Sequence, residues 1–173
     1  MNDLSEPGVL LIPATPDDAE AISAMATRIW PDAYGSILTR EQIAYMLGKM
    51  YEPSHLRREM CDEGIVYLWI VRGGERVGFF AFGPVRTGAA CPLHKCYILP
   101  EIQSQGVGSS AMELLLKRLA AEKVTSLDLR VNRRNAAAIA FYRKHGFTTQ
   151  AEDCREIGGG FVMDDYLMSR DLG

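Results

Sequence analysis

The spacing of apolar residues predicts helices in the first third of the chain. Four apolar residues recur every three or four positions, at Ala19, Ile22, Ala26 and Ile29. This spacing is typical of a helix with one buried face. Thr15 is expected to start that helix, because threonine caps helix ends and Pro16-Asp17-Asp18 suits a first turn. Two more helices are predicted, from Thr39 to about Met50 and from Pro53 to about Gly64.

After residue 64 the apolar pattern becomes that of strands. Ile65–Val71 and Arg76–Phe82 are rich in β-branched and aromatic residues and flank Gly73-Gly74, which predicts a hairpin. The other expected strands are Val9–Pro13, Leu93–Leu99, Ser126–Val131, Phe147–Glu156 and Phe161–Ser169, the last two joined at Gly158-Gly159-Gly160. The predicted order is β-α-α-α-β-β-β-α-β-α-β-β, an α/β sheet with helices on its faces.

Two helices are expected in the second half of the chain. One spans about Gly106 to Glu122, and the other runs from Asn135 to His145. The first of them carries apolar residues at helical spacing, namely Val107, Ala111, Leu114, Leu115 and Leu119. We expect these residues to form its buried face.

Composition limits the kinds of protein that this chain can be. Its 173 residues fit one domain, residues 1–173, with 47% hydrophobic and 24% charged residues. The net charge of −3 gives no overall attraction to nucleic acid or to an anionic membrane. No apolar run reaches the roughly 18 residues that span a bilayer, and Met1–Gly8 lacks the basic region of a secretion signal. We therefore expect a cytoplasmic protein.

The cysteines and histidines do not predict a metal site. The four cysteines have no CxxC spacing, and the three histidines are scattered along the chain. Reduced thiols that pack as small core residues explain the cysteines better.

The segment Tyr97–Ser110 carries the clearest chemical signal. A strand ends there, Pro100 breaks it, and a turn with glycines leads directly into an amphipathic helix. The first turn of a helix has N–H groups without partners, and the helix dipole adds positive charge. Gly106 and Gly108 have no Cβ, which lets a bulky anion approach the backbone. The segment therefore predicts a pyrophosphate site.

Two other phosphate-binding motifs are alternatives for this segment. Gly106-x-Gly108-x-x-Ala111 fits a loose dinucleotide fingerprint, with Asp128 about 20 residues further on. However, the first glycine lies seven residues after Leu99, and Asp128 lies inside a predicted strand rather than at its carboxyl end. A P-loop is excluded, because Ser109-Ser110 follows the second glycine where Gly-Lys-Ser/Thr is required.

Two motifs resemble the GNAT superfamily of N-acetyltransferases. Gln103-x-x-Gly106-x-Gly108 is similar to its Q/R-x-x-G-x-G/A signature. Downstream, Val131-Asn132-x-x-Asn135-x-x-Ala138-Ile139-x-Phe141-Tyr142-x-Lys144-x-Gly146-Phe147 resembles its strand, asparagine and helix segment. The resemblance implies a mixed, mostly antiparallel twisted sheet of six to seven strands with helices on both faces. It also implies acetyl transfer from acetyl-coenzyme A to an amine.

The resemblance assigns roles to individual residues. The pyrophosphate would lie against the backbone of seven consecutive residues, Gln103, Ser104, Gln105, Gly106, Val107, Gly108 and Ser109. Ile98 would hydrogen-bond the pantetheine arm, Asn135 would contact that arm, and the Tyr142 hydroxyl would protonate the leaving thiolate. Many members have arginine at the position of Gln103, so phosphate binding here should depend more on amides. Arg133, Arg134 or Lys144 is a candidate for the missing cation, with solvated surface charge as the alternative.

The reaction also needs a base, because an alkylamine with a pKa of about 10.4 is mostly protonated at neutral pH. His94 is the candidate, since it lies four residues before Ile98 and regular alternation puts both side chains on one face. A partly buried structural histidine is the equal alternative. We expect direct attack in a ternary complex, because neither Cys91 nor Cys96 fits a plausible acyl-cysteine site. An acyl-cysteine route through Cys96 is the minor alternative, since Cys96 shares the predicted strand face of His94.

The acceptor is expected to be a small-molecule amine or a peptide N-terminus. Trp30, Tyr34 and Tyr45 are candidates to line its pocket, although hydrophobic packing explains them equally well. The family resemblance also makes a homodimer plausible. A protein of another class, a regulatory module that binds coenzyme A without turnover, is the main alternative to an enzyme.

Overall fold

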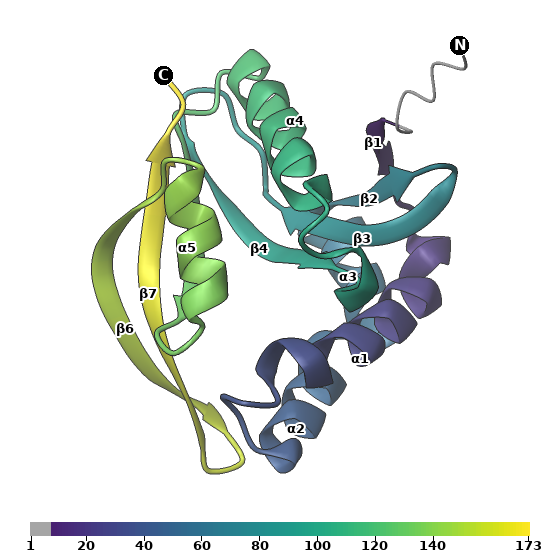
Figure 1. Ribbon diagram of the computed structural model, residues 1–173, viewed down its shortest axis with the longest axis vertical. Helices are drawn as coiled ribbons and strands as arrows, with labels where there is room; N and C mark the ends of the chain where they lie inside the picture. The colour runs from purple at the N-terminus through teal and green to yellow at the C-terminus, as the bar shows by residue number, and fades with distance from the viewer. Residues whose placement is uncertain (1–7) are drawn as a thin grey trace.

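A seven-stranded sheet forms the centre of the protein in the computed structural model, which describes residues 8–173 (Figure 1). The strands are β1 (Val9–Pro13), β2 (Val66–Arg72), β3 (Glu75–Phe82), β4 (Ala90–Ile98), β5 (Ser126–Asn132), β6 (Thr148–Gly158) and β7 (Phe161–Asp171). They lie in the order β1-β2-β3-β4-β5-β7-β6, and only β4 and β5 run parallel. The predicted mostly antiparallel sheet is confirmed. Of Met1–Gly8, the segment that lacks the basic region of a secretion signal, residues 1–7 lie outside the described residues.

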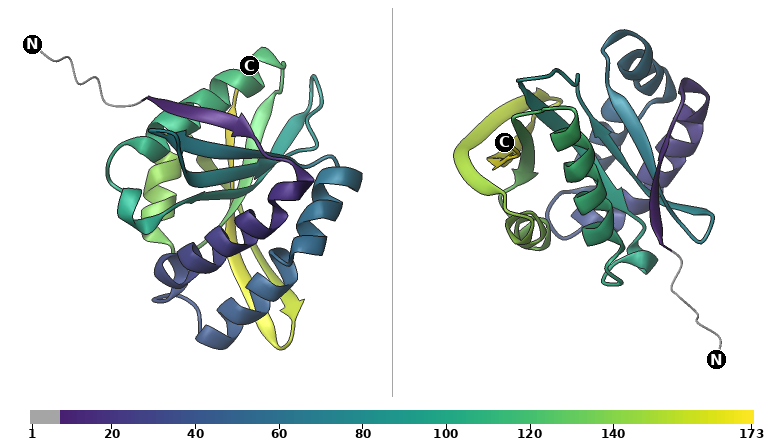
Figure 2. Two further views of the ribbon diagram at one scale, coloured as in Figure 1. Left: turned by 90° about the vertical axis from the view of Figure 1, so that its right-hand side faces the viewer. Right: turned by 90° about the horizontal axis from the view of Figure 1, so that it is seen from above.

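Helices cover both faces of the sheet, as predicted. The helices are α1 (Ala19–Tyr34), α2 (Arg40–Met50), α3 (Pro53–Asp62), α4 (Val107–Ala121) and α5 (Ala136–Lys144). One apolar core joins α4 and α5 to the sheet, and a second joins α1, α2 and α3 to the opposite face (Figure 2). Among residues 8–173, no helix has the length and apolar character needed to cross a membrane.

Most of the predicted buried positions are buried. Every member of the first predicted helix set is at most 1% exposed, namely Ala19, Ile22, Ala26 and Ile29. In α4 the prediction was wrong for Leu114, which is 38% exposed, whereas Leu116 is 7% exposed. Positions 107, 111, 115 and 119 differ by four and form the buried stripe, so Leu114 falls outside it. Helix α1 also continues past Pro31 to Tyr34.

The sheet divides between β4 and β5, and this division positions the site. The two strands pair over only four residues, Ala90–Leu93 with Ser126–Leu129. Beyond this pairing β4 runs on to Ile98 and β5 to Asn132, and the two strands separate. The parallel pair therefore leaves an opening within an otherwise continuous sheet.

The β6–β7 hairpin spans this opening at one end. The Tyr45 hydroxyl donates to the Ile157 carbonyl at 2.8 Å, and the Gln42 side-chain amide donates to the Val162 carbonyl at 2.9 Å. Both donors belong to α2, so the hairpin tip is tied to a helix that packs on the other half of the sheet (Figure 1). These contacts fix the two halves relative to each other.

Candidate active site

A cleft of about 800 Å³ lies where β4 and β5 separate. Its walls come from α4 and α5 on one face of the sheet and from α1 and the following segment on the other. The cleft therefore passes through the gap in the sheet, with walls from elements on both of its faces. Of the eleven predicted site residues, nine line it: His94, Ile98, Gln103, Ser104, Gly106, Gly108, Ser109, Asn135 and Tyr142. Of the other two, Val107 is buried in the core and Gln105 is exposed beside the turn.

The start of α4 presents backbone N–H groups at one end of the cleft. Gly106 is the N-cap residue, with a φ of 77°, and no side chain caps the helix. The N–H groups of residues 107 to 109 lie in the first turn, where an α-helix provides no intrahelical acceptor. A Cβ added to Gly106 would meet no atom within 4 Å. The turn is therefore sterically open at Gly106, and anion binding there stays a prediction.

Gly108 has a different reason to be glycine. A Cβ added there would lie 3.2 Å from Ile98 Cδ1 and 3.4 Å from Phe141 Cε2. Such contacts are tighter than normal packing, so the missing side chain lets α4 approach β4 and α5. The missing Cβ thus leaves open space at Gly106, whereas at Gly108 it makes room for the packing of the protein itself.

Glutamine side chains brace the turn before α4. The Gln103 side-chain amide donates to the Ile98 carbonyl at 3.3 Å. Gln105 donates to the Glu101 carbonyl at 2.9 Å and accepts from Arg72 Nη1 at 2.6 Å. These bonds hold the turn from within. Because these glutamine side chains already bond within the protein, an anion at the turn would be bound by backbone N–H groups and nearby cations.

Of the three candidate cations, Lys144 lies beside the start of α4. Its Nζ is 3.4 Å from Ser109 Oγ, and both residues line the cleft. Arg133 instead pairs with Glu152 at 3.1 Å and with Asp164 at 3.3 Å. Arg134 donates to a backbone carbonyl of the segment between α1 and α2. Lys144 is therefore the cation that best fits a phosphate at the turn.

Strand β4 presents the backbone of Ile98 to the opening. The Leu99 N–H donates to the Val77 carbonyl of β3 at 2.9 Å, so it is already used. Successive residues of a strand point their backbone groups to opposite edges, so the N–H and carbonyl of Ile98 point away from β3. This agrees with Gln103 reaching the Ile98 carbonyl. Of the backbone N–H groups of Tyr97 to Leu99, that of Ile98 is thus the one that faces the cleft.

Tyr142 lies in α5 with its hydroxyl against the thiol of Cys96. The side chain is 9% exposed, and burial raises the pKa of the phenol well above its usual value. Burial also raises the pKa of the Cys96 thiol to about 12. At neutral pH both groups therefore keep their protons. A protonated phenol suits a general acid, whereas a protonated thiol is a poor nucleophile.

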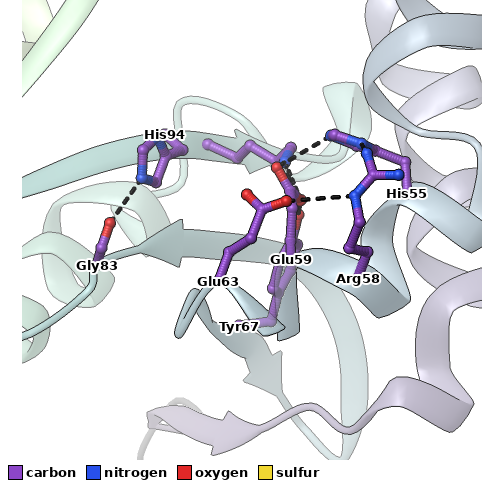
Figure 3. A network of polar contacts seen from close by, with 8 residues as sticks. His55, Arg58, Glu59, Glu63, Tyr67, Gly83 and His94 are labelled. Carbon is purple, nitrogen blue, oxygen red and sulfur yellow. Dashed lines mark hydrogen bonds and ion pairs between the residues drawn. The ribbon is translucent and has the colours of Figure 1, made fainter. Parts of the chain in front are cut away.

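His94 lies at a break in the regular alternation of β4. Ala81 of β3 pairs with Lys95 and Phe82 pairs with Leu93, so His94 is the extra residue of a β-bulge. The alternation that we used to place His94 with Ile98 is interrupted there. Its Nε2 is 2.8 Å from the Gly83 carbonyl (Figure 3). Because a carbonyl only accepts, Nε2 carries the hydrogen, and Nδ1 remains to accept a proton.

A buried charged network that we did not predict supports β4 at this point (Figure 3). Lys95 Nζ donates to the Glu59 carboxylate at 2.7 and 3.0 Å and to the Tyr67 hydroxyl at 2.6 Å. Tyr67 also donates to Glu59, and His55 Nε2 lies 3.2 Å from the same carboxylate. The side chains of Lys95 and Glu59 are 3% and 12% exposed. The network therefore ties α3 to the strand that forms one wall of the cleft.

The pKa shifts in this network follow from burial and pairing. Burial alone would raise the pKa of Glu59, but the Lys95 ammonium and the hydrogen bonds from Lys95 and Tyr67 outweigh it and lower the pKa. Burial lowers the pKa of Lys95, and the Glu59 carboxylate offsets part of this effect. Lys95 Nζ and the Glu59 carboxylate form a buried ion pair, so each group depends on the other.

One of the three predicted acceptor-side aromatics lines the cleft. The Tyr34 and Tyr97 hydroxyls are 2.9 Å apart, and both residues belong to its wall. Trp30 is 1% exposed in the core, and Tyr45 holds the β6–β7 hairpin. The packing explanation therefore holds for Trp30 and Tyr45. Burial raises the pKa of Tyr34, which keeps its phenol neutral.

Asp128, the residue that supported a dinucleotide site, has a structural role. Its carboxylate accepts from the hydroxyls of Ser126 at 2.9 Å and Ser169 at 2.6 Å. The bond from Ser169 joins β7 to β5 within a mostly antiparallel sheet, and the bond from Ser126 lies within β5. A doubly wound dinucleotide fold requires a parallel sheet, so that alternative is not supported.

Known proteins share this architecture. Residues 22–147 match the model of the Acetyltransferase (GNAT) family. The chain is 27% identical over 157 residues to an uncharacterized N-acetyltransferase of Mycobacterium tuberculosis (strain ATCC 25618 / H37Rv), covering 90% of this chain and 98% of that protein. The PaiA N-acetyltransferase of Thermoplasma acidophilum, solved with coenzyme A, superposes with a TM-score of 0.77 at 20% identity, covering 95% and 99% of the two chains. The ribosomal-protein-S18-alanine N-acetyltransferase of Escherichia coli gives 0.67 at 19% identity, covering 95% and 94%.

The family match covers most of the chain and includes both motifs identified in the sequence. It confirms the expected enzyme class and co-substrate, an acetyltransferase that uses acetyl-coenzyme A. The solved structures, at or below 20% identity, support the fold. The chain belongs to the GNAT family of acetyltransferases.

Proposed function

We propose that this enzyme transfers an acetyl group from acetyl-coenzyme A to a primary amine by direct attack in a ternary complex. The acceptor is a small molecule or a peptide N-terminus. The cleft that passes through the sheet is the observation that supports this most strongly, because it is lined from both faces. The thioester would enter from the side of α4 and α5, and the amine from the side of α1.

The residues on the α4 side fit the anionic co-substrate. The N–H groups of residues 107 to 109 and the ammonium of Lys144 would hold the pyrophosphate. The exposed backbone of Ile98 would pair with the pantetheine arm, and its N–H would polarise the thioester carbonyl. Asn135 caps α5 through its side-chain oxygen, which accepts from the Ala138 N–H at 3.1 Å. The side-chain nitrogen of Asn135 would then donate to the pantetheine arm.

Proton transfer would use groups on either side of the reacting atoms. Tyr142 would give its phenolic proton to the thiolate as the carbon–sulfur bond breaks, and the proton that the attacking nitrogen loses on becoming an amide would restore the phenol. Nδ1 of His94 would take the ammonium proton of the acceptor, directly or through water, before the nitrogen attacks. The high pKa of the Cys96 thiol supports a route without an acyl-cysteine.

An activity screen tests this proposal. Free thiol release from acetyl-coenzyme A would be followed with amino acids, polyamines, aminoglycosides and short peptides as acceptors. Tyr142→Phe should lower kcat by about 10²–10⁴ with little change in cofactor affinity. Tyr166→Phe is the matched control, because this half-buried tyrosine packs against Arg133 outside the cleft. Binding of acetyl-coenzyme A without thiol release from any amine would favour the regulatory module.

Two expectations about the whole protein stay predictions. A homodimer is proposed from the family resemblance, and sedimentation of the purified protein would test it. A cytoplasmic location is also proposed, and the cysteines within residues 8–173 are unpaired, which agrees with reduced thiols. The expectation that the cysteines pack as core residues was wrong for Cys61 and Cys154, which are exposed.

A further inference from the structure

Some of the charged side chains on the cleft wall have an ion-pair partner of opposite charge, and others do not. Those within the described part of the chain are Asp32, Lys95, Arg130, Arg134 and Lys144, besides His94. Lys95 pairs with Glu59 at 2.7 Å and Arg130 with Asp153 at 2.9 Å. Among the ion pairs of residues 8–173, neither Arg134 nor Lys144 has a carboxylate partner. The cleft therefore holds two cations without acidic partners.

These two cations belong to different parts of the cleft. Lys144 contacts Ser109 at the start of α4, where the co-substrate phosphates are expected. Arg134 lies in the turn between β5 and α5, and its Nη2 donates to the Ile37 carbonyl in the segment between α1 and α2. That segment lines the acceptor side together with Asp32, Tyr34 and Ser36. Arg134 thus brings an uncompensated positive charge to the side that the amine would enter.

We infer that the acceptor carries a carboxylate besides its reactive amine, and that Arg134 is a specificity-determining residue that binds this carboxylate. The inference rests on the proposed function and names the acceptor class, amino acids and compounds with the same pair of groups. A guanidinium has five N–H donors, and the Ile37 carbonyl accepts from only one of its nitrogens. Two parallel N–H groups therefore remain that can bind both oxygens of a carboxylate.

The charges of the cleft also oppose the other common class of acceptor. A polyamine carries several ammonium groups and needs several carboxylates to replace its lost hydration. Asp32 is the one acidic side chain on the cleft wall within residues 8–173. A polycation in this cleft would also face the Arg134 guanidinium. The electrostatics therefore favour an acceptor with an anionic group.

Matched acceptor pairs test the inference. Each amino acid of a panel of aliphatic, aromatic, acidic and basic members is compared with its own carboxamide, and kcat/KM is measured by thiol release. The amide has the same side chain and amine but lacks the carboxylate. It also has a less basic amine, which favours attack, so a preference for the acid cannot come from amine ionisation. We expect the free acid to be preferred at least about tenfold, since hydrogen bonds to charged groups are among the strongest in proteins.

The same panel is measured with Arg134→Gln, with Arg134→Lys and with a charge-matched control. Arg134→Gln should remove most of the acid preference by raising KM for the acids, with KM for acetyl-coenzyme A unchanged. Arg134→Lys should keep part of the preference for the free acid, because lysine retains the positive charge but lacks the paired N–H donors of the guanidinium. Arg143→Gln, which removes the same charge from an exposed residue of α5 outside the cleft, should leave the preference intact.

Several results would overturn the inference while leaving the enzyme proposal standing. Equal kcat/KM for acids and amides in the wild type would do so, as would efficient turnover restricted to polyamines. If Arg134→Gln lowered kcat/KM equally for acids and amides, the role of Arg134 would be to hold the segment at Ile37 rather than to bind a carboxylate. A raised KM for acetyl-coenzyme A with an unchanged acid preference would assign it to the co-substrate. Absence of thiol release with every amine would overturn both proposals.

Discussion

Removing the Glu59 carboxylate is expected to destabilise the protein strongly. In Glu59→Gln the Lys95 ammonium, 3% exposed, would lose its counter-charge and two hydrogen bonds to a carboxylate. Breaking a buried ion pair by removing one partner costs about 3–5 kcal/mol, because the remaining charge is buried and uncompensated. Glutamine keeps the volume and a hydrogen-bonding oxygen, so we expect the lower end, about 3 kcal/mol. For a domain of this size that loss lowers Tm by roughly 6–12 °C.

The loss should depend on pH in a defined direction. Burial already lowers the pKa of Lys95, and without Glu59 this pKa falls further. The unfolded variant then binds more protons than the folded variant between the folded pKa of Lys95 and its unfolded pKa of about 10.4. Stability of the variant relative to the wild type therefore rises with pH in that window. The deficit measured at pH 7 should shrink by pH 9.5.

Urea unfolding followed by circular dichroism, at pH 7 and at pH 9.5, measures both effects. Glu63→Gln is the matched control, because Glu63 is 48% exposed and its partner Arg58 is 57% exposed. An exposed pair of this kind contributes little, and we expect a change below about 1 kcal/mol. A Glu59→Gln deficit as small as that of the control, or one that does not shrink at high pH, would refute the reasoning.

Three further predictions concern single residues around the cleft. Gly108→Val should lower Tm by several degrees as well as weaken acetyl-coenzyme A binding, because its Cβ presses on Ile98 and Phe141; an unchanged Tm in a thermal melt would contradict this packing role. Asn135→Ala should lose about 1 kcal/mol in urea unfolding, since the α5 N-cap bond disappears, whereas Asn135→Asp should retain most of it. Cys96→Ala should keep kcat within about tenfold in the thiol-release assay; loss of all turnover, or an acetylated Cys96 in a mass spectrum, would point to a covalent route instead.

The order of elements and the open turn before α4 could be predicted from the sequence because their signals are local. Neighbouring residues determine the turn that connects the strand ending near Ile98 to the helix after Gly106. The structure has the open, uncapped helix start that these residues predict. Periodicity placed the α1 core correctly for the same reason. It failed at Leu114, where two overlapping apolar stripes in α4 leave the buried face undetermined.

Features that depend on distant contacts could not be predicted. The bulge at His94 arises from the pairing of β4 with β3, and nothing within the strand marks where alternation breaks. Lys95 and Glu59 are 36 positions apart, so no local pattern joins them, although a lysine within an apolar strand signals a buried partner. The Arg134 contact with Ile37 spans 97 positions. The separation of β4 from β5 likewise follows from how the two halves of the sheet pack.

A crystal structure of the protein with acetyl-coenzyme A tests the central claim most directly. The account predicts pyrophosphate oxygens within hydrogen-bonding distance of the N–H groups of residues 107 to 109, with the pantetheine arm beside Ile98. It also predicts the thioester sulfur facing the Tyr142 hydroxyl. Phosphates bound away from the start of α4, or a sulfur remote from Tyr142, would contradict it.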